Sequence, residues 1–484
     1  MTIAAKDKYD VVVVGSGAAG QAAALTAQEN GASVLLLEKG RTTGGSANYS
    51  EGIFAVGSYL QKEKGIEVSG TDVLKEEVEY SKYKADSRIW RKYVDTSAEN
   101  VQWLANEGVV FERVQAMGAG EATWHIYEGF GYGAIHKALE PKFLKLGGEL
   151  LTSTAAVALK LNEDGSKTIT LRNEADGTTE DVTAKVVVLA AGGYLNNKEM
   201  MAKETDYDLS RMIPVSSGKG TGDGLRLGWS VGGRKYGTGM AMLFGGYLDD
   251  PDQPYFKMMS SQMNVAAGQQ PLLWVNEDGE RFVDESVIYN FSYAGNALYT
   301  QNEVYSILDT GVIEKMAKDG NYMGLGVYVE RGDKMDKLAA EIDQAVADKK
   351  PFIFKADTIE ELAEKTGLPK DQLTATIARY NGFAAKGEDE DFGKEADYLV
   401  AVEKGPFYAF KLNIGAFCTM GGLKVNVNNE VEDEKGKVIP GLYAAGNDAS
   451  GLTGDTYGPN MPGTCAGYAF YSGRNAALDA QKYL

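Results

Sequence analysis

Cysteine and histidine are scarce in this sequence, whose 484 residues include two of each. Cys418 and Cys465 form no CxxC motif, and His125 and His136 are too few to complete a zinc finger or to accompany an attached c-type haem. We therefore expect no disulfides and no metal site, and a reduced, cytoplasmic location.

Long apolar runs and positive charge are also lacking. No stretch reaches the ~18 consecutive apolar residues needed to cross a membrane, and residues 1–10 carry charges in place of the apolar segment of a signal peptide. Lys and Arg number 49 against 68 Asp and Glu, which gives a net charge of −19. This charge disfavours nucleic acid and anionic lipid as partners. The length and the 44% of hydrophobic residues fit a globular chain of two domains.

What the sequence does contain is a dinucleotide-binding pattern over residues 10–38. The apolar run 11–14 predicts a buried parallel strand, the turn GSGAAG follows at 15–20, the Ala-rich segment 21–30 predicts a helix, and a second apolar run ends at Glu38. Free N–H groups at the start of the helix can donate hydrogen bonds to a pyrophosphate, and the Glu38 carboxylate can accept hydrogen bonds from ribose hydroxyls. A closely packed glycine turn without a ligand is the alternative interpretation. The predicted contacts are Gly15, Gly17, Ala18, Ala19, Gly20 and Glu38.

The rest of the chain favours a nucleotide-binding domain interrupted by an insertion. Residues 149–190 alternate as strands, and residues 440–446 are again a strand that enters a glycine turn. From about residue 236 the sequence becomes irregular and rich in Met and aromatic residues. We predict an α/β fold: a Rossmann-like nucleotide-binding domain made of residues 1–236 and 405–484, and an inserted α+β capping domain of residues 237–404.

Several motifs together resemble one flavoprotein family, that of the soluble fumarate reductases, succinate dehydrogenase flavoprotein subunits and 3-ketosteroid dehydrogenases. They are GSGAAG with Glu38, GGSANYSEG, GFGYGAIHKAL, VLAAGG, GTGDG, DGERFVDES, the long segment 357–393, CTMGGLKVN and VIPGLYAAGN. The match covers nearly the whole chain, and the last four motifs are specific to this family. The resemblance implies that the nucleotide is FAD and that the first domain is an FAD-binding domain.

The resemblance also implies which residues hold FAD. In the family, the three glycines of the turn face the pyrophosphate, Glu38 faces the adenine ribose, Ser46 and Ser50 line the flavin, and Asn447 takes the place of a second ribose contact. Backbone N–H groups near Gly463 would stabilise the charge on the reduced flavin. The predicted cofactor set also includes Lys39, Gly44, Gly45, Gly52, Ala191, Gly192, Asp223, Gly446, Thr464 and Cys465. Cys465 is interpreted as a small residue at a helix start, because a cysteine without a partner is seldom redox-active. Family members that attach FAD covalently often use a histidine near the N-terminus; because the first histidine here is His125, we expect FAD to be non-covalent.

Three places in the chain, which comprise four residues, depart from the fumarate reductases. Tyr289 occupies the place of their proton-donating arginine, Phe417 and Cys418 stand where histidines would hold a carboxylate, and Met461 stands where an arginine would hold the other carboxylate. Residues 258–276 contain no Asp, Glu, Lys, Arg or His. A dicarboxylate would be buried there without a partner, at a cost of several kcal/mol for each charge. We therefore expect that the protein is not a fumarate reductase.

The stretch ESVIY instead resembles the NESxxY motif of the ketosteroid dehydrogenases, in which the tyrosine moves a proton. We predict that Tyr289 does so here, with Tyr457 as the next candidate and simple packing as the alternative role for Tyr289. The predicted substrate pocket contains Phe417, Met461, Met420 and Tyr132. The expected substrate is a neutral polycyclic or polyphenolic small molecule: an enone, a ketosteroid, or an isoflavonoid such as tetrahydrodaidzein, because the chain also resembles tetrahydrodaidzein reductases in length.

A different class remains open, that of a flavoprotein subunit that passes electrons to a partner protein. The sequence contains no second dinucleotide motif, no haem motif and no iron–sulfur cysteine set. The electrons therefore come from a separate donor, either a reductase or NAD(P)H. The direction of the reaction, the donor and the oligomeric state are left open by the sequence.

Overall fold

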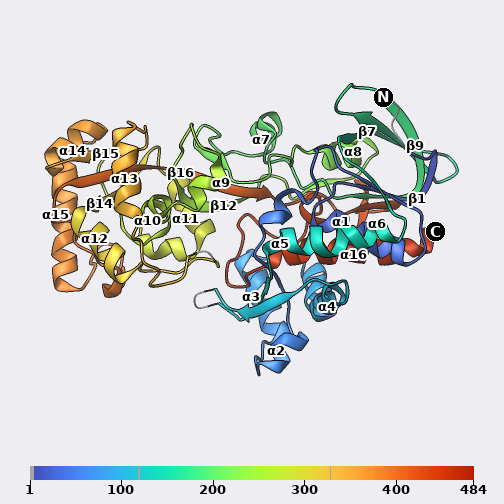
Figure 1. Cartoon of the computed structure of the whole chain (residues 1–484), viewed down its shortest axis with the longest axis horizontal. Coiled ribbons are helices and arrows are strands. Elements are labelled where there is room, and N and C mark those ends of the chain that lie inside the picture. The colour runs from blue at the N-terminus through green and yellow to red at the C-terminus, as the bar shows by residue number, and fades with distance from the viewer. Residues whose placement is uncertain (1–4, 118–119, 328) are drawn as a thin grey trace. The chain divides into compact units, whose positions relative to one another are not determined.

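The computed structural model describes residues 5–117, 120–327 and 329–484 (Figure 1). Contacts divide the chain into two compact units. The first consists of Met1–Asp206, Ser216–Met242 and Cys418–Leu484, and the second of Tyr207–Val215 and Leu243–Phe417. These limits differ from the predicted domains at residues 207–215, 237–242 and 405–417. Residues 207–215 and 405–417 lie in the second unit because strands from both segments pair in its sheet.

The first unit is built on a sheet with parallel strands at its centre. The path runs β18–β19–β9–β1–β2–β6, with β7 and β8 added through β9. Strand β1 pairs in parallel with both β2 and β9. Four successive valines of β1 are buried, as expected for a strand covered on both faces. The strands are β1 (Lys8–Val14), β2 (Val34–Leu37), β6 (Glu149–Leu151), β7 (Thr154–Leu161), β8 (Lys167–Asn173), β9 (Thr179–Leu189), β18 (Glu430–Glu432) and β19 (Val438–Ala444).

Two helices from distant parts of the chain pack against each other in this unit: α1 (Ala18–Glu29) and α16 (Thr464–Ala480) (Figure 1). A Cβ atom added to Gly473 would lie 2.0 Å from the carbonyl oxygen of Ala19, so only glycine permits this close approach. The other helices are α2 (Tyr59–Glu63), α3 (Gly70–Tyr80), α4 (Ser87–Asn106), α5 (Phe130–Gly133), α6 (Glu140–Lys145), α7 (Lys198–Glu204) and α8 (Asp223–Ser230).

Short elements complete the first unit. A sheet of three strands contains β3 (Gly52–Phe54), β4 (Phe111–Gln115) and β5 (Trp124–Tyr127), and β11 (Lys235–Tyr236) pairs with β17 (Gly422–Leu423). The 3-10 turns are η1 (Gly45–Tyr49), η5 (Gly446–Asp448) and η6 (Gln481–Tyr483), and η2 (Ala134–Leu139) is a short π-helix.

The second unit has its own sheet, centred on the long strand β16 (Phe407–Thr419), which continues into the first unit. Its path runs β10–β16–β14–β13, and β12 and β15 also pair with β16. The other strands are β10 (Met212–Pro214), β12 (Ala241–Tyr247), β13 (Leu273–Asn276), β14 (Val304–Asp309) and β15 (Ile353–Ala356). Helices α14 (Ile359–Thr366) and α15 (Lys370–Lys386) share an apolar core with this sheet, which includes Val275, Leu362 and Tyr380.

The remaining elements of this unit are α9 (Tyr255–Met259), α10 (Gln262–Gln269), α11 (Phe291–Tyr299), α12 (Thr310–Asp319), α13 (Leu338–Ala347), η3 (Glu285–Tyr289) and η4 (Ala396–Tyr398). Helices and strands alternate through both units, and the predicted α/β class is confirmed. Among the residues that the structure describes, no helix is long and apolar enough to cross a membrane.

Candidate functional site

The glycine turn joins β1 to α1 in a way that few residues permit. Gly15 has φ +103°, and a Cβ atom there would lie 2.3 Å from the carbonyl oxygen of Ala190. A Cβ atom on Gly20 would lie 1.7 Å from the carbonyl oxygen of Gly15. Gly17 caps α1, and no side chain caps this helix end. The first N–H groups of α1, on Ala18 and its neighbours, are thus left for an anionic group, as a pyrophosphate requires.

Glu38 lies directly after β2 and is buried, with 5% of its surface exposed. The Ser16 hydroxyl donates a hydrogen bond of 2.5 Å to Glu38 Oε2, and the Gly40 N–H donates one of 2.7 Å to Oε1. The carboxylate is therefore fixed beside the glycine turn. This is the geometry in which a carboxylate can accept hydrogen bonds from ribose hydroxyls.

The loop after Glu38 returns to the glycine turn. The Gly44 N–H donates to the Ser16 carbonyl at 3.0 Å, and Gly44 has φ +86°. Turn η1 then begins at Gly45. The Ser46 hydroxyl contacts Ser217, and the Ser50 hydroxyl donates to the Ala47 carbonyl at 2.8 Å. Gly52 lies in β3, where a Cβ atom would come within 2.3 Å of the His125 carbonyl oxygen.

Lys39 and Asp223, both predicted to contact the cofactor, form an ion pair with each other. Lys39 Nζ lies 2.6 Å from Asp223 Oδ2 and also contacts the Thr221 hydroxyl. Burial would raise the pKa of Asp223, but the charge and hydrogen bond of Lys39 outweigh burial and lower the pKa. The pair connects the end of β2 to the first turn of α8.

Asp448 is not among the predicted site residues, but it contacts the turn after β9 that contains the predicted cofactor residues Ala191 and Gly192. Its buried carboxylate accepts hydrogen bonds from the N–H groups of Ala191, at 2.7 Å, and Gly193, at 2.8 Å. Burial raises the pKa of Asp448 to about 6. Between these residues Gly192 has φ +87°, and nothing lies within 4 Å of where its Cβ atom would be. Asp448 therefore holds the turn after β9 in place. The sequence indicates its location only through its neighbour Asn447, which is a predicted cofactor residue.

The first turn of α16 forms a second uncapped helix end. Gly463 has φ +83° and precedes the helix, and no side chain caps it. The Gly463 carbonyl accepts a hydrogen bond of 3.0 Å from the Phe54 N–H. The Cys465 N–H donates to the Tyr457 hydroxyl at 3.4 Å, and burial raises the pKa of Tyr457. This helix end, which includes Thr464, presents N–H groups that can stabilise negative charge.

The structure corrects the interpretation of Cys465 as a cysteine without a partner. Cys418 Sγ lies 4.0 Å from Cys465 Sγ, and both thiols are free. Asn447 Oδ1 lies 3.5 Å from Cys465 Sγ. The two cysteines meet because the end of β16 is buried beside the start of α16. Met420 and Met461, predicted to contact the substrate, are buried in the same unit.

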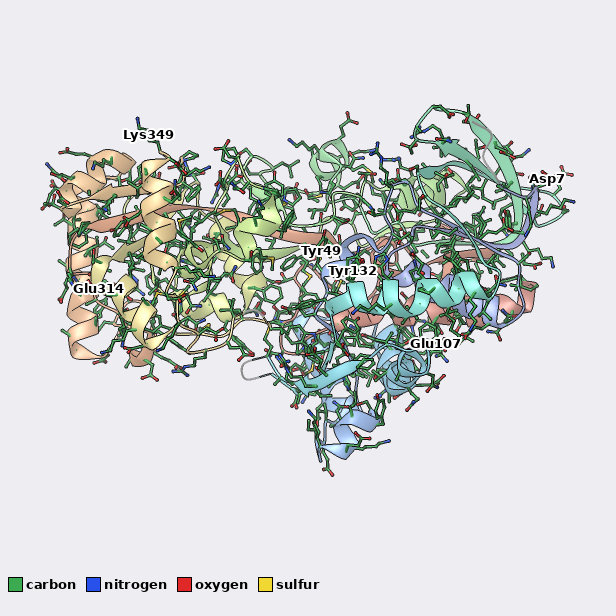
Figure 2. All side chains as sticks on the ribbon, viewed as in Figure 1. Asp7, Tyr49, Glu107, Tyr132, Glu314 and Lys349 are labelled. Carbon is green, nitrogen blue, oxygen red and sulfur yellow. The ribbon has the colours of Figure 1, made fainter. Side chains whose placement is uncertain are left out.

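Tyr132 is also in the first unit but is largely exposed. Its side chain, on α5, has 55% of its surface accessible (Figure 2). The ring packs against His136 with a centroid separation of 4.4 Å. A role for Tyr132 in substrate binding stays a prediction, and it would involve a side chain that lies largely on the surface.

Tyr289 and Phe417, the other predicted residues, belong to the second unit. Tyr289 is half-buried and ends η3. Phe417 packs against Phe244 and Phe291, with ring centroids 4.8 Å and 6.4 Å apart. Phe244 and Phe291 are not among the predicted site residues. The only indication in the sequence is that Phe291 lies two residues after Tyr289. We call Phe244, Phe291 and Phe417 the aromatic cluster.

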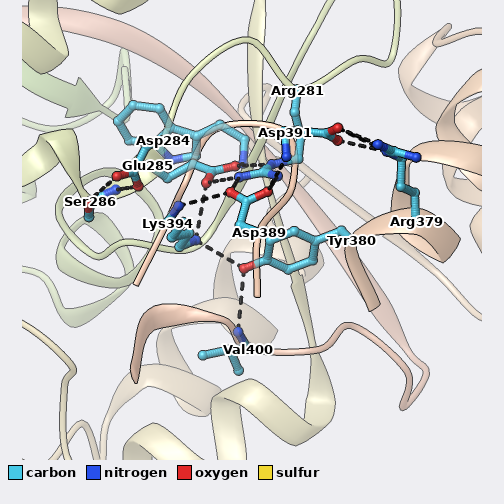
Figure 3. Close-up of polar contacts among 11 residues, drawn as sticks. Arg281, Asp284, Glu285, Ser286, Arg379, Tyr380, Asp389, Asp391, Lys394 and Val400 are labelled. Atoms are coloured by element: carbon cyan, nitrogen blue, oxygen red, sulfur yellow. Dashed lines mark hydrogen bonds and ion pairs between the residues drawn. The ribbon is translucent and has the colours of Figure 1, made fainter. Parts of the chain in front are cut away.

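A buried ion network lies at the start of the segment that leads to Tyr289. Arg281 makes four hydrogen bonds, each of 2.9 Å, two to Glu285 and two to Asp389 (Figure 3). Lys394 Nζ lies 3.2 Å from Glu285 Oε2. The side chain of Arg281 is 4% exposed, and the other three are fully buried. Two positive charges therefore meet two negative charges, and neither cation is free to hold an acidic substrate.

The structure thus places the predicted residues in two groups. Every predicted cofactor residue lies in the first unit, together with Gly463, Tyr457, Met461, Met420 and Tyr132, whereas Tyr289 and Phe417 lie in the second.

This combination of a glycine turn, a buried carboxylate fixed beside it and two uncapped helix ends is typical of a nucleotide-binding α/β fold. Residues 10–458 match the model of the FAD binding domain family, so the chain belongs to that family and binds FAD. The predicted cofactor and family resemblance are confirmed, and the protein is an FAD-dependent reductase or dehydrogenase.

The chain is 68% identical to the vinyl phenol reductase of Lactiplantibacillus plantarum over 484 residues, which cover 100% of this chain and 98% of that protein. It is 29% identical to a fumarate reductase (cytochrome) of Shewanella frigidimarina, over 99% of this chain and 78% of that protein. A solved 3-ketosteroid delta1-dehydrogenase of Sterolibacterium denitrificans has the same fold, with a TM-score of 0.76 and 20% identity over 98% of this chain and 100% of that one.

The residues of the first unit fit FAD. The tight glycine turn leaves the first N–H groups of α1 uncapped, Glu38 is fixed beside it, and Gly192 borders open space. When bound, FAD supplies a centre that accepts or donates a hydride.

Proposed function

We propose that the protein reduces the carbon–carbon double bond of a vinyl group carried by a neutral phenol. The observation that carries this proposal is the 68% identity, over the whole chain, to a vinyl phenol reductase. The proposal narrows the predicted class of neutral polycyclic or polyphenolic substrates to a single phenolic ring, and it fixes the direction as reduction.

The electrostatics of the second unit support a neutral substrate. Arg281 and Lys394 are both engaged by Glu285 and Asp389 in the buried ion network. Residues 258–276, which include α10, contain no charged side chain. A dicarboxylate such as fumarate would lose its hydration there without gaining a cation, which costs several kcal/mol. We infer that fumarate is not a substrate.

The aromatic cluster supports a planar ring as substrate. Aromatic side chains favour edge-to-face and offset contacts with other rings, worth ~0.5–1.5 kcal/mol for each pair beyond the area buried. Phe291, a member of this cluster, is two residues after Tyr289 in the sequence. A substrate ring bound against Phe291 would therefore contact a residue close in sequence to the proposed proton donor.

The proposed reaction adds one proton and one hydride across the double bond. A para hydroxyl pushes electron density towards the terminal vinyl carbon, so this carbon takes the proton and the benzylic carbon takes the hydride. Tyr289 donates the proton, because a tyrosine hydroxyl is protonated at neutral pH. N–H groups at the start of α16, next to Gly463, would stabilise the negative charge that the reduced flavin carries. The substrate gains two electrons and two protons in total.

The electron donor is proposed to be a separate reductase or NAD(P)H. Substrate reduction can be measured without this donor, because the flavin can be reduced by light or by dithionite. Binding of FAD without a covalent link is likewise proposed.

Anaerobic, reduced protein should be mixed with para-vinylphenol while flavin absorbance is followed. We expect reoxidation of the flavin and formation of one para-ethylphenol for each flavin oxidised. Styrene, which lacks the hydroxyl, and fumarate serve as controls and should reoxidise the flavin no faster than buffer. Failure of para-vinylphenol to reoxidise the flavin would refute the substrate; equal rates with styrene would refute the role of the hydroxyl.

A further inference from the structure

The only two cysteines of the sequence lie side by side. Cys418 is 8% exposed, at the end of β16, and Cys465 is in the first turn of α16. Their sulfur atoms are 4.0 Å apart, although 47 positions separate them in the chain. Formation of a disulfide, whose S–S bond is about 2.0 Å, requires the sulfurs to approach by about 2 Å, which is within the range of side-chain rotation.

The surroundings of the two thiols differ, which gives them different reactivity. Cys465 lies at the uncapped start of a helix, where N–H groups and the helix dipole favour a thiolate. The hydrogen bond from Cys418 lowers the pKa of Cys465, and the same bond, together with burial, raises the pKa of Cys418. Cys465 is thus suited to attack an oxidant, and Cys418 to attack the oxidised sulfur that results.

We propose that Cys418 and Cys465 form a peroxide-reactive thiol pair that closes to an intramolecular disulfide. The Cys465 thiolate attacks one oxygen of hydrogen peroxide, the O–O bond breaks, and the leaving hydroxide takes up a proton to give water. The Cys418 sulfur then attacks the sulfenic acid on Cys465, the S–O bond breaks, and a second water leaves. Two thiols lose two electrons and two hydrogens, and one peroxide becomes two waters.

This disulfide would connect the end of β16 to the first turn of α16. That turn carries the N–H groups of Thr464 and Cys465, and Asn447 lies 3.5 Å from the Cys465 sulfur. Oxidation would therefore change the surroundings of residues predicted to hold FAD. The inference about the thiols does not depend on the substrate, because it concerns chemistry of the protein alone.

The test is to expose FAD-loaded, fully reduced protein to hydrogen peroxide, block remaining thiols with an alkylating reagent and measure the intact mass under denaturing conditions. We expect a mass lower by two hydrogens, complete loss of alkylation at both cysteines, and a peptide pair that joins residues 418 and 465. Dithiothreitol should restore both alkylation sites. A change in the flavin absorbance spectrum should accompany closure of the disulfide.

The matched variant is Cys418→Ser, which keeps the attacking thiol and removes its partner. Peroxide should then add oxygen to Cys465 with no loss of hydrogens. The proposal is overturned if the parent protein keeps two alkylatable thiols while its methionines become oxidised, or if the disulfide joins two chains. The peptide map of the parent protein is sufficient by itself to distinguish these outcomes, so the test does not require the variant to fold well.

Discussion

Replacing Arg281 with methionine is expected to destabilise the segment that leads to Tyr289. The guanidinium makes four hydrogen bonds of 2.9 Å to two buried carboxylates, and it stacks over the Tyr380 ring at 5.0 Å. Methionine preserves much of the side-chain volume but removes the charge. Glu285 and Asp389 would then face each other with only Lys394 to balance them, so one negative charge would stay buried without compensation.

The size of the effect follows from the burial of the network. Breaking a buried ion pair by removing one partner costs ~3–5 kcal/mol, because the remaining charge keeps its desolvation penalty. At about 1.4 kcal/mol for each factor of ten, local opening should become roughly 10²- to 10⁴-fold more frequent. Hydrogen–deuterium exchange of residues 273–289 measures this opening directly, since the Trp274 N–H donates to Glu285 Oε1 at 3.3 Å.

Arg379→Met provides the matched control (Figure 3). Arg379 pairs with Asp391 at 2.5 Å, but its side chain is 58% exposed. An exposed ion pair contributes only ~0–1 kcal/mol, so exchange in residues 273–289 should change little in this variant. If Arg281→Met accelerates exchange no more than Arg379→Met does, the buried network is not what holds this segment.

Three further predictions concern catalysis, cofactor attachment and pH. Tyr289→Phe should lower turnover of para-vinylphenol by roughly 10²-fold or more, while reduction of the flavin by an artificial donor and the activity of the control Tyr293→Phe stay near the parent values; retained turnover would make Tyr289 a packing residue. Acid precipitation should leave FAD in the supernatant, because both ring nitrogens of buried His125 are already hydrogen-bonded; a fluorescent flavin band on a denaturing gel would contradict this. Burial would raise the pKa of Asp389, but its bonds to Arg281 lower it to about 2 from an ordinary 3.8. Its contribution to stability is therefore complete above the ordinary value and is lost as the pH falls towards about 2. Urea unfolding should become less sensitive to pH in this window for Asp389→Asn, and identical pH profiles would refute the assignment.

Features set by neighbouring residues were predictable from the sequence. The predicted strand 11–14 forms the last four residues of β1, and β2 ends at Leu37, directly before Glu38, where the second apolar run was predicted to end. Helix α1 begins three residues earlier than predicted, since Ala18, Ala19 and Gly20 form its first turn as well as the end of the glycine motif. Such elements depend on local periodicity and on the conformations that glycine permits.

Contacts between distant segments were not predictable from local pattern. The carboxylate of Asp448 serves N–H groups 257 and 255 positions away, on Ala191 and Gly193. Arg281 and Asp389 are 108 positions apart. The local sequence around one residue of such a pair does not indicate the identity or position of its partner, so these contacts can be identified only from the folded structure. The roles of Tyr289 and the aromatic cluster in catalysis stay predictions.

The packing of α1 against α16 has a consequence for synthesis of the protein on the ribosome. About 430 residues separate the two helices, which is roughly 20–90 s of translation at usual rates. During that time the Ala-rich α1 lacks the surface that buries it, whereas all of residues 243–417 emerge before α16. The nascent chain can therefore complete the core of the second unit first, and we expect FAD to be captured only after α16 has left the ribosome.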